Sequence, residues 1–420
     1  MLLKNIRGLV GAFETPPPFV AGSDMSQFPV VEDAWLAVEA GRVVDWGEMS
    51  EFPGIADWSG LEVVDCSGRY VLPAWCDSHT HLVFAGNRSG EFQDRLDGMS
   101  YQEIAAKGGG ILHSAAALEA TSEEILFEAA WGRLQAAMRD GVGAMEIKTG
   151  YGLSVAGELK SLAVVARLRA HSPIPVRLTL LGLHAVPKGF QDASAWTEKA
   201  IHELLPQAMA QGGCDYIDGF CEQGYFDTSH LRAWTEAGRG WGLRAKWHVN
   251  QFSAFGGVAE AVALGARSVD HLEVCTAEDV RALQAGMGSP DGPTFPVALP
   301  GCSHFLSIPY APGRALIDAG LPLVLATDHN PGSAPSGSMT RTVQRAMVTM
   351  RLKPLEAIAA ATLNGAAAMD LAHEVGTLSR DRRANFMVTR PMNHLVEIGY
   401  YFDENPIDWV CLNGTRVDSR

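Results

Sequence analysis

At 420 residues, the chain is long enough for one large α/β domain with an accessory domain, and its 47% hydrophobic content is that of a globular protein with a sizeable core. The formal net charge of −15 argues against nucleic acids or anionic membranes as partners, because either would require clustered Lys and Arg. The seven cysteines are odd in number and show no CxxC spacing, which fits a reducing compartment. No secretory signal pattern opens the chain and no apolar run reaches spanning length, so we expect a cytoplasmic protein.

Short β-prone runs dominate the two ends of the chain. Residues 34–38 and 42–46 flank a glycine-containing turn, and residues 409–412 and 415–417 flank the turn pair Asn413-Gly414. We therefore expect residues 1–67 and 381–420 to pair into one small β-sandwich. Residues 68–380 would form the central domain.

The central part alternates strand-like runs with amphipathic helical stretches. Helical periodicity is clearest in residues 122–139, 155–170 and 231–237. The eight expected strands are residues 71–76, 143–148, 176–181, 216–221, 244–248, 268–271, 295–299 and 321–328. This β-then-α rhythm indicates a parallel sheet, and eight units predict a (β/α)8 barrel. A doubly wound sheet is the alternative, but no G-x-G-x-x-G spacing follows a strand.

Two histidines end the first of these strands, in the stretch Asp77-Ser78-His79-Thr80-His81. A strand places residues i and i+2 on one face, so His79 and His81 should point together. Converging neutral imidazoles are good ligands for zinc or iron. A lone HxH pair also arises by chance or through packing, so the weight of this motif depends on further ligands downstream.

Such ligands stand at the other expected strand ends, where a barrel of this kind places its chemistry. Read in chain order, these positions hold His79 and His81, Lys148 and Tyr151, His184, Glu222, His248 and Gln251, His271, and Asp328 and Asn330. At least five of the 13 histidines fall there. Random placement would rarely produce this clustering, so we expect a metal site.

The order of these ligands resembles the amidohydrolase superfamily of metal-dependent hydrolases, which has HxH after strand one, His after strands five and six, and Asp after strand eight. Within it, five segments resemble the imidazolonepropionase family. They are DSHTHLVF (77–84), EIKTGYGL (146–153), LGLHAVP (181–187), SVDHLE (268–273) and ATDHNPGS (326–333).

The resemblance implies hydrolytic ring opening of 4-imidazolone-5-propionate to N-formimidoyl-L-glutamate in histidine degradation. It also implies one divalent ion, zinc or iron, with the ligands His79, His81, His248 and Asp328. Many dinuclear members carry a bridging carboxylated Lys at the end of strand four, where this chain has Cys221-Glu222. We therefore expect a single ion per chain, and a homodimer is common in such families.

Further roles follow from the same resemblance. Asp328 or His271 would transfer protons, and Gln251 would orient water or substrate by hydrogen bonding, since an amide cannot act as a base. Arg88 and Tyr151 would bind the substrate carboxylate, for which a permanently charged, planar guanidinium is well suited. The residues expected around the ring are His184, Asn330, Gly332 and Ser333.

The chain departs from the usual family residues at Asn87, at Cys302-Ser303-His304, at His329 and at Asn385. These differences bear on fine specificity more than on the class of reaction. Two alternatives stay open from the sequence. A deaminase of the same superfamily would share the metal ligands, release ammonia and have no need of Arg88. A non-catalytic metal-dependent binding protein would hold ligand and metal without turnover.

Overall fold

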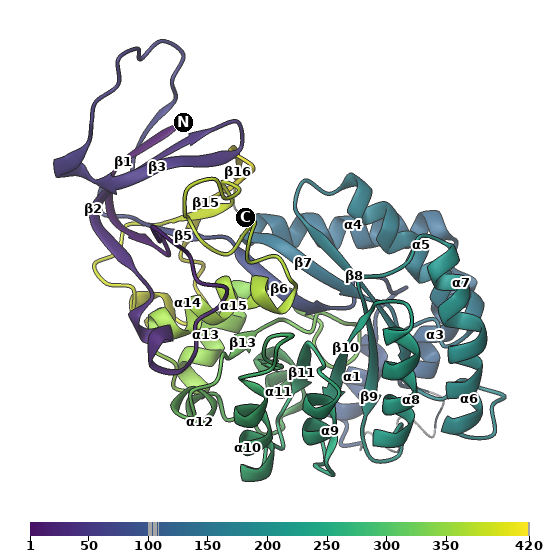
Figure 1. Cartoon of the computed structure of the whole chain (residues 1–420). Helices are drawn as coiled ribbons and strands as arrows, with labels where there is room; N and C mark the ends of the chain where they lie inside the picture. The colour runs from purple at the N-terminus through teal and green to yellow at the C-terminus, as the bar shows by residue number, and fades with distance from the viewer. Residues whose placement is uncertain (100–102, 104–106, 108, 419–420) are drawn as a thin grey trace.

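The computed structural model describes residues 1–99, 103, 107 and 109–418. Its named strands form two sheets of eight strands each, and Figure 1 shows a helix-covered barrel beside an outer sheet. Among the described residues, no helix combines the length and apolar character needed to cross a membrane.

The barrel strands are parallel and follow one another in space in the order of the chain, as the sequence predicts. They are β6 (Trp75–Thr80), β7 (Val142–Lys148), β8 (Val176–Leu183), β9 (Tyr216–Cys221), β10 (Arg244–Val249), β11 (Ser268–His271), β12 (Phe295–Ala298) and β13 (Val324–Leu325). Hydrogen bonds join the first strand to the segment after the last one, from Asp328 N to His79 O and from His81 N to His329 O, both 2.9 Å long. This closure brings Asp328 next to the two histidines of the HxH motif.

Helices follow the barrel strands and cover their outer side (Figure 1). They are α1 (Ser89–Leu96), α3 (Ile111–Ala120), α4 (Glu123–Arg139), α5 (Val155–His171), α6 (Ala193–Lys199), α7 (Leu205–Ala210), α8 (Thr228–Arg239), α9 (Gly257–Ala263), α10 (Ala277–Gly286), α11 (Pro300–Leu306), α12 (Gly313–Asp318), α13 (Met339–Thr349), α14 (Pro354–Ala361) and α15 (Leu363–Ala368), with the π-helix η3 (Ala200–Leu204). Two 3-10 helices, η1 (Gly22–Gln27) and η2 (Met49–Glu51), precede the barrel, and α16 (Glu397–Tyr400) lies between two strands of the outer sheet.

The three helices expected from periodicity are all present. Ser122 and Ser154 cap α4 and α5 by accepting hydrogen bonds from Ile125 N and Gly157 N. Each of these helices buries an apolar stripe against the barrel, and the buried Trp234 anchors α8 through its indole N–H to Asp218 O (3.0 Å).

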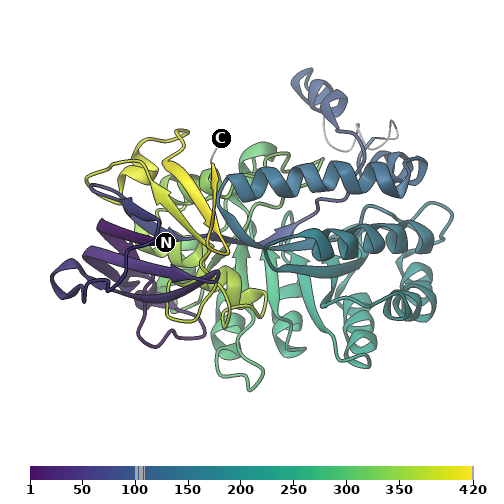
Figure 2. The ribbon, with the colours of Figure 1, turned by 90° about the horizontal axis from the view of Figure 1, so that it is seen from above.

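The outer sheet joins the two ends of the chain, as expected. Its strands are β1 (Leu2–Val10), β2 (Val30–Glu39), β3 (Arg42–Glu48), β4 (Val63–Asp65), β5 (Tyr70–Pro73), β14 (Phe386–Thr389), β15 (Ile407–Leu412) and β16 (Thr415–Asp418). Both expected hairpins form, β2 with β3 and β15 with β16, and antiparallel pairing of β5 with β14 links the N-terminal strands to the C-terminal ones. Figure 2 shows these purple and yellow strands together at one end of the molecule.

Two strand expectations need correction. The run 71–76 is not one strand: its first three residues belong to β5 of the outer sheet, and only Trp75 and Cys76 belong to barrel strand β6. Within the run 321–328, only Val324 and Leu325 form the parallel ladder with β12. Pro322 cannot extend this ladder, because it lacks a backbone N–H. The domain limits at residues 67 and 380 stay a prediction.

Candidate active site

Three histidines converge at the carboxyl ends of the barrel strands. His79 lies in β6, His81 directly follows it, and His248 lies in β10; one ring nitrogen of each comes within 4.8 Å of the others. Asp328 joins them after β13, with Oδ1 3.4 Å from His79 Nε2 and 3.6 Å from His81 Nε2. All four side chains are buried. The structure therefore brings together the four metal ligands that the sequence predicts.

The outward ring nitrogens of these histidines all have partners. His79 Nδ1 is 2.6 Å from Asp270 Oδ2, His248 Nδ1 is 3.1 Å from Asp218 Oδ1, and His81 Nδ1 is 3.2 Å from the carbonyl of Thr149. A carboxylate or carbonyl accepts from Nδ1–H, so Nε2 of each ring is left with a lone pair facing the centre.

The centre fits a divalent metal ion. Nε2 of His79 and of His248 are buried, and neither has a hydrogen-bond partner among the described residues. Burial lowers the pKa of all three histidines well below the usual value, which keeps the rings neutral, as metal ligation requires. Three imidazole nitrogens and one carboxylate suit both zinc and iron.

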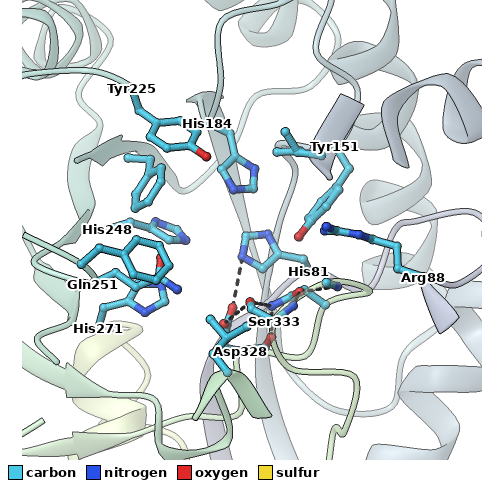
Figure 3. Close-up of a pocket in the computed structure, with 16 residues that line it drawn as sticks. His81, Arg88, Tyr151, His184, Tyr225, His248, Gln251, His271, Asp328 and Ser333 are labelled. Carbon is cyan, nitrogen blue, oxygen red and sulfur yellow. Dashed lines mark hydrogen bonds and ion pairs between the residues drawn. The ribbon is translucent and has the colours of Figure 1, made fainter. Parts of the chain in front are cut away.

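A pocket of about 660 Å³, open solvent at its mouth included, lies over this centre. Figure 3 shows Arg88 and Tyr151 on one side of it, His271 and Gln251 on the other, and Asp328 with Ser333 between the two sides. The predicted site residues that line it are His81, Arg88, Tyr151, His184, His248, Gln251, His271, Asp328, Asn330, Gly332 and Ser333. His79 lies outside the lining, beneath the pocket.

Arg88 is held on the pocket wall by an acid that the sequence argument did not identify. Nε of Arg88 donates to Glu91 Oε2 (2.8 Å), and the other oxygen of Glu91 accepts from Gly110 N (3.0 Å). Nη1 of Arg88 packs against Gly332, where an added Cβ would come within 2.1 Å of it. Gly332 therefore leaves room for the guanidinium, and Glu91 fixes its orientation.

The loop after β7 carries Tyr151 and supports His184. Gly150 adopts a left-handed backbone (φ 107°), and its carbonyl is hydrogen-bonded to His184 Nδ1 at 2.9 Å. Buried Glu158 accepts from the amides of Gly150, Gly152 and Leu153 at 2.7, 2.7 and 2.9 Å. This carboxylate fixes the loop, so Tyr151 and His184 face the pocket from a rigid support.

Asp328 sits at a tight turn whose polar groups are internally bonded. Its backbone is left-handed (φ 56°), Ser333 Oγ donates to its Oδ2 (3.3 Å), and Asn330 Oδ1 accepts from Gly332 N and Ser333 N, both at 2.8 Å. Burial raises the pKa of the Asp328 carboxyl to about 6, although nearby His271 opposes this rise. A non-glycine residue in this conformation marks a locally strained site.

His271 and Gln251 form the opposite wall. His271 Nδ1 is 3.4 Å from Glu273. Burial alone would lower the pKa of His271, but the neighbouring Glu273 carboxylate outweighs burial and raises this pKa to about 8. His271 can therefore carry a proton at neutral pH. Gln251 Nε2 donates to the thiol of Cys302 (3.3 Å), which places one of the departures from the family pattern inside the site.

Two other departures contact residues next to the site. Ser303 Oγ donates to Glu273 Oε1 (3.2 Å), and the carbonyl of His329 accepts from His81 N (2.9 Å). Asn87 accepts from Ser89 N at the start of α1, and His329 packs against Phe84. His304 is exposed. Asn385 donates to Gly143 O (3.0 Å) and accepts from Asn413 N (2.7 Å), so it ties the outer sheet to barrel strand β7.

Several supporting residues escaped the sequence argument. Asp218, Asp270, Glu91 and Glu273 contact site residues, yet they match no spacing rule. The first three stand inside strands or a helix, and Glu273 lies in the turn after β11. A signal existed only for Asp270 and Glu273, which flank His271 in the segment SVDHLE. Glu222, a strand-end residue, supports the loop after β10 by accepting from Phe252 N (2.9 Å).

A parallel barrel with three histidines and an aspartate at the carboxyl ends of its strands defines a metal-dependent hydrolase. The model of the Amidohydrolase family matches residues 70–417. The chain is 46% identical to the imidazolonepropionase of Christiangramia forsetii over 99% of this chain and all of that protein, and 37% identical to that of Geobacillus kaustophilus over 99% and 97%. The chain belongs to the amidohydrolase family and, within it, to the imidazolonepropionases.

Solved structures confirm the fold. A mutant atrazine chlorohydrolase from Arthrobacter aurescens, complexed with zinc and atraton, aligns with a TM-score of 0.71 at 14% identity, covering 100% of this chain and 95% of that one. Guanine deaminase from E. coli gives the same TM-score and identity, covering 100% and 99%. At such identity the likeness concerns the fold alone, and the full-length relatives do not favour the deaminase alternative.

Proposed function

We propose that this chain hydrolyses the ring amide bond of 4-imidazolone-5-propionate to give N-formimidoyl-L-glutamate, a step of histidine degradation. One observation carries the proposal: a single pocket presents the His/Asp cluster at its base and a partly buried, oriented arginine on its wall. The substrate has a ring carbonyl, which is attacked, and a carboxylate tail, which must be held. The His/Asp cluster matches the carbonyl, and the arginine matches the carboxylate.

We propose that His79, His81, His248 and Asp328 hold one divalent ion, zinc or iron. Such an ion, when bound, acts as a Lewis acid on the carbonyl and lowers the pKa of water from about 15.7 to about 7. The support is the set of neutral, inward-facing nitrogens and the carboxylate oxygen between them.

The proton transfers fall to Asp328 and His271. Asp328 Oδ2 is held by Ser333, and from this position the carboxylate can accept the proton of the attacking water and return it to the departing ring nitrogen. His271, protonated through its contact with Glu273, can donate to the oxygen that becomes negative at the ring carbonyl. Gln251 orients water or substrate through its amide.

Arg88 and Tyr151 hold the propionate, and the remaining pocket residues enclose the ring. Because the charged tail lies far from the bonds that change, its binding energy can serve to position the carbonyl over the metal centre. The residues proposed for the ring are His184, Asn330, Gly332 and Ser333.

The test is an assay of the purified, metal-loaded chain on 4-imidazolone-5-propionate in ¹⁸O-labelled water. We expect N-formimidoyl-L-glutamate with one ¹⁸O atom in its new carboxylate and no ammonia. Ammonia release would identify a deaminase, and binding without turnover would identify a non-catalytic protein; either result would overturn the proposal.

We further propose that the protein acts in the cytoplasm as a homodimer, without nucleic-acid or membrane partners. The acidic net charge of −15 and the seven unpaired cysteines support this setting. Sedimentation analysis would test the dimer.

A further inference from the structure

Beneath the pocket, the barrel interior contains a layer of charged side chains. Glu146 and Lys148 of β7, Asp218 of β9, Lys246 of β10 and Asp270 of β11 are each at most 1% exposed. Barrel interiors are normally filled by branched apolar residues. Burying five charges is costly unless each is paired, so the arrangement calls for a physical reason.

Lys148 lies at the centre of this layer. Its Nζ is 2.7 Å from Asp218 Oδ2, 2.9 Å from Glu146 Oε1 and 3.4 Å from Asp270 Oδ2. The neighbouring Lys246 forms an ion pair with Glu146. One ammonium group therefore holds three carboxylates from three different strands.

Two of these three carboxylates continue directly to the metal centre. The Asp270 oxygen that faces Lys148 is also the one that contacts His79 Nδ1 (2.6 Å). Asp218 Oδ2 faces Lys148, and both oxygens of Asp218 lie 3.1 Å from His248 Nδ1. Two series of contacts thus start at the Lys148 ammonium: one reaches His79 through Asp270, and the other reaches His248 through Asp218.

We propose that Lys148 is the positioning residue of the metal centre, holding Asp218 and Asp270 where they orient the rings of His248 and His79. The inference rests on the metal centre of the proposed function. Without the ammonium, two neighbouring carboxylates would repel each other and separate, and both rings would lose the acceptors that keep Nε2 facing inward.

The test compares Lys148→Met with Lys246→Met in the full chain. The two lysines are equally buried and both pair with Glu146, so the second variant is a matched control for the loss of a buried cation. Metal affinity is measured by competition with a chromophoric chelator, and ligand geometry by the visible spectrum of the Co²⁺-loaded protein.

We expect Lys148→Met to weaken metal binding by about 10- to 100-fold, the usual effect of removing an outer-shell partner, and to change the Co²⁺ spectrum. Lys246→Met should keep the wild-type spectrum and an affinity within the same order of magnitude. Wild-type affinity and spectrum in Lys148→Met, or equal losses in both variants, would overturn the proposal.

A second variant covers the case in which Lys148→Met does not fold. Asp218→Asn preserves the shape of the side chain that links Lys148 to His248, and removes its charge. We expect weaker metal binding and an altered Co²⁺ spectrum, and an unchanged affinity would refute the role of this link. None of these readouts uses the substrate, so a failure here is distinguishable from a failure of the proposed reaction.

Discussion

Replacement of Arg88 tests substrate recognition separately from chemistry. In Arg88→Gln the guanidinium on the pocket wall is lost, while Glu91 remains on the same wall with only the Gly110 amide as a described partner. The substrate carboxylate then meets a nearby anion in place of a cation. Removing one side of a desolvated, charge-assisted pair costs about 2 to 4 kcal/mol in kcat/KM, which is roughly 30- to 700-fold. Because Glu91 adds repulsion, we expect the upper part of this range.

The assay is steady-state kinetics on 4-imidazolone-5-propionate and on an analogue whose carboxylate is amidated. Arg88→Gln should lose activity on the charged substrate and little on the analogue, with metal content unchanged. Arg95→Gln is the matched control, because Arg95 lies in helix α1, which begins directly after Arg88, and donates to Phe305 O, outside the pocket lining. Equal losses on both compounds, or no loss on either, would remove Arg88 from the site.

Three further outcomes are expected. Chelator-washed active protein should contain one metal equivalent per chain by elemental analysis, and two equivalents would contradict the single-ion centre. His248→Ala should lose both metal and turnover with an unchanged circular dichroism spectrum, and full metal with normal turnover would show that strand β10 was assigned wrongly. Burial raises the pKa of Asp140 from 3.8 to about 6, so the folded chain keeps a proton that the unfolded chain releases. As the pH rises from 4 to 6, the urea-unfolding free energy of the wild type should therefore fall relative to that of Asp140→Asn, by up to about 3 kcal/mol. A relative rise over the same pH range would refute the shift.

The barrel could be predicted because its local signals agree with one another. Strand-length apolar runs, capped helices and strand-end histidines all indicate the same architecture, and β9 and β11 have the expected bounds. The crossing between the two sheets could not be predicted. Ala74 separates β5 from β6, and its amide donates to Asn385 O (3.0 Å), a residue more than 300 positions away in the chain. A continuous apolar run gives no sign of such a crossing.

The site shows the same division between local and distant contacts. The convergence of the four proposed metal ligands could be predicted because each lies at the end of an apolar strand and matches a known motif. Their partners depend on the register between strands: His248 of β10 lies opposite Phe220 in β9, and this register brings its ring to Asp218, two residues earlier in β9. Register between parallel strands is set by the whole barrel, so Asp218 gave no local signal, and Asp270 gave one only through its place beside His271 in the segment SVDHLE.

One local pattern did hold information about the charged layer. In Glu146-Ile147-Lys148, polar and apolar residues alternate, and such alternation ordinarily indicates a strand with one face in solvent. Here both charged residues point into the barrel, and Ile147 packs in the hydrophobic core. A parallel strand is covered on both faces, so charges at alternate positions within it can be paired only with other buried groups. In a chain whose other motifs predict a parallel barrel, this alternation therefore indicates a charged interior next to a functional site, because natural sequences break the apolar pattern of a core mainly where the chemistry requires it.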